Sequence, residues 1–184
     1  MIYKQEIKFL NRDVYDLLIV GGGAVGVSLA SSLSFEGINI CVVESGLDCE
    51  DSKYDKLKYV ETSGLNIKPN SRERMIGGSG QTWNGILANF DICDFNDRGN
   101  NYPALGIDQN EIKELLDKFG KFFKIPKSKS FNLSRYPNSQ LELGDPFEQK
   151  VFLEQNPVFK FGDRLKHIFE RPGIDLISGW TVSN

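Results

Sequence analysis

The segment "LLIVGGGAVG", residues 17–26, constrains the fold of this chain more than any other. The apolar run of residues 15–20 leads straight into glycines, which is typical of a strand buried on both faces of a parallel sheet. Gly21, Gly23 and Gly26 then fit the spacing G-x-G-x-x-G. In that pattern the first glycine permits a tight turn, the second lets backbone approach a pyrophosphate, and the third lets a helix pack closely on the strand.

The residues after the glycines complete a βαβ unit. Residues 24–35 are expected to form a helix whose apolar face carries Val25, Leu29 and Leu33. Residues 38–43, "INICVV", predict a second buried strand. A strand, a glycine turn, a helix and a strand in this order form a unit whose crossover is almost always right-handed.

Glu44 closes the second strand, where a carboxylate accepts hydrogen bonds from the adenosine ribose hydroxyls of a dinucleotide. A 2′-phosphate would meet this negative charge, so NADP is disfavoured. The alternative for the whole motif is an ordinary glycine-rich turn from a strand into a helix. The motif by itself does not separate FAD from NAD.

Composition limits the remaining function classes. A chain of 184 residues with 40% hydrophobic residues is the size of one domain, or of one domain with a small appendage. The net charge of -3 provides no polybasic surface, so neither nucleic acid nor an anionic membrane is an expected partner. Cys41, Cys49 and Cys93 form no C-x-x-C pair, which argues against a metal site and a disulfide framework. With no signal peptide at the amino terminus, these cysteines predict a reduced, cytoplasmic protein.

The middle of the chain predicts one long excursion and one clear helix. Residues 45–74 are polar with little periodicity, and a short helix is expected near residues 53–59. Residues 107–126 form the clearest helical pattern, because Asp108 and Glu111 have capping-box spacing before an apolar stripe that we expect to be core.

The rest of the chain predicts less regular structure. Residues 127–146 are rich in Ser, Lys, Asn and Pro and are expected to be a surface loop or an insertion. A short helix is expected over residues 161–170, and a strand pair or a bent strand over residues 174–183. We therefore predict an amino-terminal part of a dinucleotide-binding domain over residues 1–125. Residues 126–184 are predicted to be a loop-rich segment that begins a further domain or later elements of the first.

A second glycine-rich segment, "RERMIGGSGQTWNG", covers residues 72–85. NAD bound in an open cleft does not need such a segment, whereas a larger buried cofactor does. The side chains and glycines expected to face a ligand are Gly77, Gly78, Gly80, Trp83, Asn84 and Gly85. For Trp83 and Asn84 the alternative is a packed aromatic ring beside an amide that caps a turn.

With both segments in place, the chain resembles the glucose-methanol-choline (GMC) oxidoreductases, flavoenzymes that oxidise alcohols. The resemblance is closer to the sugar- and sterol-oxidising branches than to the choline-like ones. It is based on "VGGGAVG" with Glu44, on "RERMIGGSGQTWNG", on "DICDFNDR" at residues 91–98, and on "YPALGIDQNEIKELLDKFGKFFKI" with Tyr102 where the family has Trp. It implies an α/β, Rossmann-like FAD-binding domain whose parallel sheet is incomplete at the carboxyl-terminal end.

The resemblance implies a set of cofactor-binding residues. The glycines and Ser79 of the second segment would lie along the FAD pyrophosphate and the flavin, with Asn84 and Gly85 near the reactive edge of the flavin ring. Some relatives attach flavin through a His just before the Trp, and Thr82 stands there in this chain, so FAD is expected to be bound non-covalently. The full candidate set is Gly21, Gly23, Ala24, Gly26, Glu44, Ser45, Arg74, Gly77, Gly78, Ser79, Trp83, Asn84 and Gly85.

No catalytic residue is assigned. Hydride transfer from an alcohol to flavin needs a base that takes the hydroxyl proton, and His is the usual choice. His167 is the only His in the chain, and it is expected on a surface helix. In the family the catalytic His and most of the substrate-binding sheet lie near the carboxyl end, in a part that this sequence does not contain.

The sequence therefore predicts the cofactor-holding part of an FAD-dependent oxidoreductase acting on a CH–OH group. A sugar is the alcohol substrate that the branch resemblance suggests. Alone the chain is expected to be inactive, and a chain carrying the missing carboxyl-terminal half is its expected partner. The alternatives are a non-catalytic dinucleotide-binding remnant that serves as a partner subunit, and a compact NAD-dependent dehydrogenase.

Overall fold

The computed structural model describes residues 2–4, 12, 14–50, 56–68, 71–99, 103–126 and 131–183. The chain divides into two compact units, Met1–Trp83 with Lys160–Asn184, and Asn84–Phe159. The predicted boundary between residues 125 and 126 falls inside the second unit. Each unit has its own sheet, and each is described below by itself.

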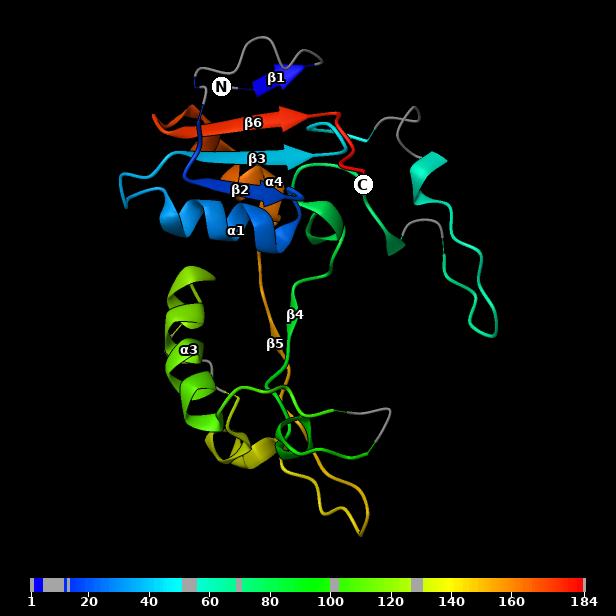
Figure 1. Cartoon of the computed structure of the whole chain (residues 1–184). Coiled ribbons are helices and arrows are strands. Elements are labelled where there is room, and N and C mark those ends of the chain that lie inside the picture. The colour runs from blue at the N-terminus through cyan, green and yellow to red at the C-terminus, as the bar shows by residue number, and fades with distance from the viewer. Residues whose placement is uncertain are drawn as a thin grey trace. The chain divides into compact units, whose positions relative to one another are not determined.

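The first unit is built on a four-stranded parallel sheet with the order β1-β6-β3-β2 (Figure 1). Starting at the edge strand β2, the neighbouring strands β2, β3 and β6 stand in the order in which they occur along the chain. This is the 3-2-1 order of one half of a Rossmann sheet. The predicted α/β, Rossmann-like class is therefore confirmed. The strands are β1 (Ile2–Lys4), β2 (Leu17–Val20), β3 (Ile40–Glu44) and β6 (Ile174–Ser178).

Helices of the first unit pack together against the sheet. The helix α1 (Ala24–Leu33) contacts β2 and β3, and it also packs against α4 (Phe161–Leu165) and the 3-10 helix η8 (Lys166–Glu170). The predicted short helix at residues 161–170 is thus present as two joined helices. The fully buried side chains of this unit come from both helical segments and the two central strands: Val27, Ala30, Ile40, Val42, Ile168, Phe169, Ile174 and Leu176.

The apolar face predicted for the first helix is wrong. Val25 is 81% exposed and Leu29 is 43% exposed, while the buried residues of α1 are Gly26, Val27 and Ala30. The reason is the close approach of α1 to the turn that precedes it, which requires its smallest residues on the inner side. Two large apolar side chains are consequently left on the outer side.

A buried polar cluster around Asp175 lies on one face of the sheet. Leu18 pairs with Cys41 and Cys41 pairs with Asp175, so the three residues point to the same face. Asp175 is only 2% exposed, and its carboxylate accepts hydrogen bonds from Arg12 Nη1 at 2.9 Å and from Tyr15 Oη at 2.8 Å. Burial and the nearby Asp175 carboxylate raise the pKa of the Cys41 thiol to about 11, and burial together with the Asp175 hydrogen bond also raises the pKa of Tyr15.

One prediction of local structure needs correction, and another is described only in part. The expected strand pair or bent strand near the carboxyl end is one strand, β6, which ends at Ser178 and lies between β1 and β3. The short helix expected near residues 53–59 is described only from residue 56, where the 3-10 helix η2 (Lys56–Lys58) is found. Residues 53–55 lie outside the described residues.

Among the described residues of the second unit, the longest element is α3 (Gln109–Phe122). The predicted capping box is confirmed, because the Asp108 carboxylate accepts from Asn110 N at 2.7 Å and the Glu111 carboxylate accepts from Asp108 N at 3.3 Å. The predicted core role of its stripe is confirmed at Ile112, which is buried. It also holds at the end of the helix, where Phe119, Phe122 and Phe123 join an aromatic cluster with Phe159. Leu115 is an exception and is 49% exposed.

The remaining elements of this unit are short. The strands β4 (Ile86–Leu87) and β5 (Leu153–Glu154) pair antiparallel where the chain enters and leaves the unit. Residues 127–130 of the predicted loop lie outside the described residues. The described rest holds only the 3-10 helices η6 (Leu133–Arg135) and η7 (Pro137–Ser139), and a further one, η5 (Ile92–Phe95), follows β4. Throughout the described ranges, no helix is both long and apolar enough to cross a membrane.

Candidate functional site

The structure explains each of the three glycines of the first turn differently. Gly21 has a φ of +102°, a conformation that favours glycine. A Cβ at Gly26 would overlap the carbonyl oxygen of Gly21 and lie 3.3 Å from Ile19 Cγ2, so glycine there lets α1 sit on the strand. The tight turn and the close helix packing predicted for these two positions are therefore seen in the structure.

At Gly23, neither the backbone conformation nor close packing requires glycine. Its φ of -69° and ψ of -175° are extended backbone that other residues adopt, and a Cβ built on it would meet no atom within 4 Å. This residue is the N-cap of α1, so the open space lies at the end of the helix where free N–H groups and the positive dipole end favour an anion. Close approach of a pyrophosphate would require such open space at this position.

Glu44 lies at the carboxyl end of β3 and is 6% exposed. Its Oε2 accepts a hydrogen bond from Gly22 N at 2.7 Å, while Oε1 accepts from Gly46 N at 2.7 Å and from Ser45 Oγ at 3.1 Å. The carboxylate thus joins the first glycine turn to the segment that follows β3. A carboxylate offers about four acceptor positions, so one remains for the predicted ribose hydroxyl.

The second glycine segment is attached directly to the first. Gly77 N donates to the Gly22 carbonyl at 2.7 Å, and Ile76 N donates to the Leu47 carbonyl at 2.9 Å. Residues 75–77 therefore run alongside the chain that leaves β2 and the chain that leaves β3, with parallel bridges at Gly77 and Met75. Carboxyl ends of parallel strands are where open α/β sheets bind ligands.

The glycines of this second segment are explained by protein packing. Gly77 has a φ of +91°, and its absent Cβ faces the backbone of Gly162 at the start of α4. A Cβ at Gly78 would lie 3.1 Å from Gly23 Cα, and one at Gly80 would lie 2.6 Å from Phe161 Cδ2. The segment fits closely between the first turn and α4, and contact of its backbone with a ligand stays a prediction.

The two segments border one open depression of about 450 Å³. It extends along the outer side of β2 and α1, and Val25 and Leu29 contribute the large side chains that α1 leaves exposed. Of the predicted site residues it brings together five from the two glycine segments: Gly21, Gly23, Ala24, Gly26 and Ser79.

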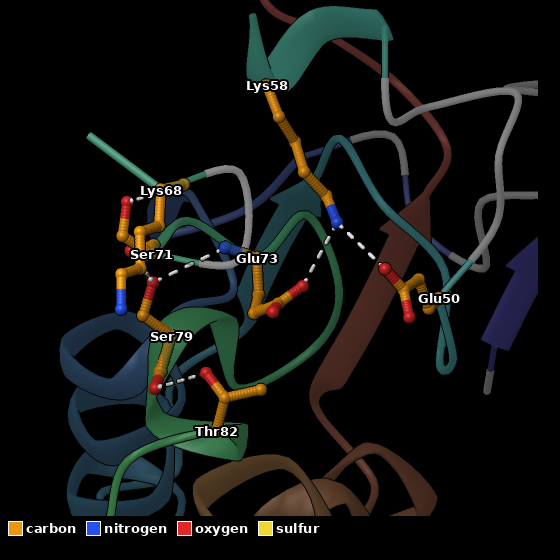
Figure 2. A network of polar contacts seen from close by, with 7 residues as sticks. All are labelled: Glu50, Lys58, Lys68, Ser71, Glu73, Ser79 and Thr82. Atoms are coloured by element: carbon orange, nitrogen blue, oxygen red, sulfur yellow. Dashed lines mark hydrogen bonds and ion pairs between the residues drawn. The ribbon is translucent and has the colours of Figure 1, made fainter. Parts of the chain in front are cut away.

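A polar network holds the second segment from the other side (Figure 2). Lys58 Nζ lies 3.1 Å from Glu73 Oε2 and 3.2 Å from Glu50 Oε1, and the Glu73 side chain is only 5% exposed. Glu73 N donates to Ser79 Oγ at 3.3 Å, and Ser79 Oγ donates to the Ser71 carbonyl at 3.4 Å. The ion pair therefore connects the excursion after β3 with Ser79, which borders the depression.

Trp83 is a packed aromatic ring, which is the alternative that the sequence left open for it. Its ring packs against Phe161, with ring centroids 5.9 Å apart, and its carbonyl accepts from Lys160 Nζ at 2.8 Å. The Asn84 Oδ1 accepts from Ile86 N at 3.3 Å, as an amide that caps a turn does. Asn84 and Gly85 belong to the second unit, so their predicted place beside the flavin stays a prediction.

Sequence reasoning missed several residues of this region. Gln81 Oε1 accepts from Gly162 N at 2.6 Å and so fixes α4 against the second segment. A Cβ at Gly46 would overlap the carbonyl oxygen of Arg74, and glycine two residues after an acidic strand end is a signal that could have revealed this contact. His167 lies exposed on η8, as predicted.

Comparisons with known proteins add little. No family model and no curated protein matches the chain. One similar solved structure is that of a fungal aryl-alcohol oxidase, with a TM-score of 0.32, 17% sequence identity, and a match over 70% of this chain and 26% of that protein. The chain thus spans about a quarter of that protein's length. A likeness at this level carries no conclusion about function.

Proposed function

We propose that the first unit binds FAD non-covalently and is the cofactor-holding part of a flavin-dependent oxidoreductase that acts on a CH–OH group. One observation carries the binding proposal. The second glycine segment is hydrogen-bonded onto the first turn, yet Gly23 keeps an open space at the N-terminus of α1. Neither a positive φ nor close packing requires glycine at that position, and the open space leaves room for a phosphate at the helix N-terminus. The oxidoreductase part is based on the sequence resemblance.

The residues present fit the pyrophosphate and ribose of a dinucleotide. In the proposed complex, backbone N–H groups at Gly23 and Ala24 face the phosphates, where the helix dipole adds favourable charge. Glu44 accepts a ribose hydroxyl at its remaining acceptor position, and Gly22 and Gly46 hold its carboxylate in place for that contact. A buried carboxylate at this place repels a 2′-phosphate, which favours FAD or NAD over NADP.

FAD supplies the hydride acceptor in this chemistry. The chain itself contributes binding and orientation but no assigned proton acceptor, because its only His, His167, lies exposed on η8. We therefore propose that turnover requires a base from protein outside this sequence, carried by a partner chain or a longer form. Sustained alcohol-dependent reduction of a dye by the purified chain would contradict this part of the proposal.

The test of binding compares FAD, FMN and NADH with the full chain, by ligand-observed NMR and by thermal shift. We expect FAD to bind weakly and better than FMN, because FMN lacks the adenosine half that Glu44 contacts. Stabilisation by NADH without any effect of FAD would instead support an NAD-dependent dehydrogenase. A cooperative melt with no response to any of the three ligands would favour a non-catalytic partner subunit.

A further inference from the structure

Among the residues that the structure describes, Arg74 has no anionic partner. Its Nη2 donates to Thr181 Oγ1 at 3.2 Å and its Nη1 donates to the Leu57 carbonyl at 3.5 Å, both neutral acceptors at long distances. Its Nε is buried and has no hydrogen-bond partner in the described part of the chain. None of the ion pairs found among the described residues includes Arg74, whereas Arg12 and Lys58 in the same unit each contact a carboxylate.

This environment is costly for a guanidinium. A buried N–H without an acceptor loses hydration and gains no partner in return, and a half-buried positive charge is normally paired. The guanidinium carries five N–H donors in a planar fork, and the two hydrogen bonds named above use only part of them. A group that supplies acceptors to the terminal nitrogens, or a π face beside the guanidinium, would provide the charge with a partner.

The position of Arg74 relates it to the proposed cofactor site. Its carbonyl contacts Gly46, the residue that holds Glu44, and its guanidinium reaches Thr181, which follows the end of β6. In the strand order β6-β3-β2, the pyrophosphate turn follows β2 and Glu44 ends β3. Arg74 thus lies one strand further along the carboxyl edge, on the side of Glu44 away from the glycine turn.

A dinucleotide laid along this edge places its base next to Arg74. The pyrophosphate lies at the first turn and the adenosine ribose at Glu44, so the adenine follows in the direction of β6. Adenine offers ring-nitrogen acceptors for the N–H groups of the guanidinium and a π face on which the guanidinium can stack. A 2′-phosphate would also suit a cation, but it would lie against the buried Glu44 carboxylate.

We propose that Arg74 forms an adenine subsite, in which the guanidinium stacks on the base or donates to its ring nitrogens. The inference rests on the proposed dinucleotide binding and adds a preference for a purine base. It predicts that the chain distinguishes ADP from UDP, which share the ribose and the diphosphate and differ in the base.

The experiment measures dissociation constants of ADP and UDP for the full chain by ligand-observed NMR. Wild type is expected to prefer ADP by about fivefold or more, a difference of the size of one stacking contact. Arg74→Ala is expected to weaken ADP binding until the two ligands bind alike, and Arg74→Lys to recover only part of the preference. The control is Arg72→Ala, because Arg72 is exposed and stands two residues earlier in the same segment. A melting curve of each variant verifies folding.

The outcomes separate this inference from the proposed function. If ADP and UDP bind wild type equally, or if Arg72→Ala and Arg74→Ala have equal effects, the adenine subsite is refuted while nucleotide binding stands. If adenosine 2′,5′-diphosphate binds better than ADP and loses more from Arg74→Ala, the subsite holds a phosphate instead of a base. If wild type binds none of these ligands, the proposed function fails and the inference fails with it.

Discussion

Gly23 and Gly26 stand three positions apart in one turn, and the structure predicts different losses of stability when each is replaced by Ala. Gly26→Ala would place a methyl group on the Gly21 carbonyl, and we expect the free energy of unfolding to fall by about 2–3 kcal/mol. Gly23→Ala meets no protein atom, so its cost is expected to stay below about 1 kcal/mol, from a less favourable N-cap.

The same pair tests the ligand side of the turn. Gly23→Ala is expected to abolish ADP and FAD binding because its methyl group fills the space left for the phosphates. Urea denaturation and ligand-observed NMR on both variants measure the two effects separately. A folded Gly23→Ala variant with unchanged binding would show that the open space at the helix end is not used by the phosphates.

Cys41 predicts a loss of stability at high pH. Its folded pKa of about 11 lies above the ordinary value of 9.0, so the folded chain keeps a proton that the unfolded chain releases. The stabilisation is complete below pH 9 and is lost as the pH rises towards 11. We expect the free energy of unfolding to fall on the order of 1–3 kcal/mol over this range.

The measurement is urea denaturation at about pH 8 and about pH 10 for wild type, Cys41→Ala and Cys49→Ala. Cys41→Ala should flatten the fall in stability, although Tyr15 adds its own loss above pH 10 because its pKa is also raised. Cys49 is exposed, so Cys49→Ala should keep the wild-type pH dependence. Equal slopes for the two variants would contradict the assignment to the buried thiol.

At the scale of elements, the ion pair of Lys58 joins the η2 excursion to the second glycine segment. Glu73→Gln is expected to lower the free energy of unfolding by about 2–3 kcal/mol, because the mostly buried Lys58 ammonium loses the carboxylate of its buried partner Glu73 and keeps that of the exposed Glu50. Glu50→Gln removes that exposed partner and is expected to cost at most about 0.5 kcal/mol. Chemical denaturation of both variants gives the comparison, and similar losses would mean that burial of Glu73 does not matter.

The elements that depend on neighbouring residues could be predicted, and those that depend on distant ones could not. The capping box at Asp108 and Glu111 and the turn at Gly21 are local, so their residues indicated them directly. The exposed side of α1 was predicted wrongly because periodicity places Val25 and Leu29 on one face without saying which face the sheet covers. The place of β6 beside β3 is set by pairing between residues far apart, and no local pattern contains it.

The candidate site shows the same division. Glycine at position 23 and a carboxylate at position 44 were predicted from the chemistry that a phosphate and a ribose would need, and binding by either residue stays a proposal. Glu44 also holds Gly22 and Gly46, a role that depends on how two turns meet. The bond from Gly77 to Gly22 and the unpartnered Arg74 Nε likewise arise only when the segments come together in three dimensions.

At the scale of the whole molecule, the second unit is an insertion into the first. The chain leaves the first unit at Trp83 and returns at Lys160, whose Nζ contacts the Trp83 carbonyl at 2.8 Å. A linker of about six residues spans such a gap easily. We therefore expect a chain with a Gly-Ser linker in place of Asn84–Phe159 to retain a cooperative melt and the ADP binding of the full chain.

The control for this deletion replaces the residues of α4 and η8 by the same linker. These helices bury Ile168 and Phe169, so their loss should abolish the cooperative transition in circular dichroism. If the first deletion also melts without cooperativity, the first unit depends on the second for its stability, and the division into two folding units is refuted.

The position of β6 has a consequence for synthesis on the ribosome. The strands β2 and β3 and the helix between them are contiguous and emerge early, whereas β3 waits for β6 until the whole second unit has been translated. During that interval the growing chain presents a strand edge with unpaired backbone groups, a site where another chain can add. The carboxyl edge that carries the candidate site is completed only when β6 arrives, so faults in late folding should remove nucleotide binding before they remove the early βαβ unit.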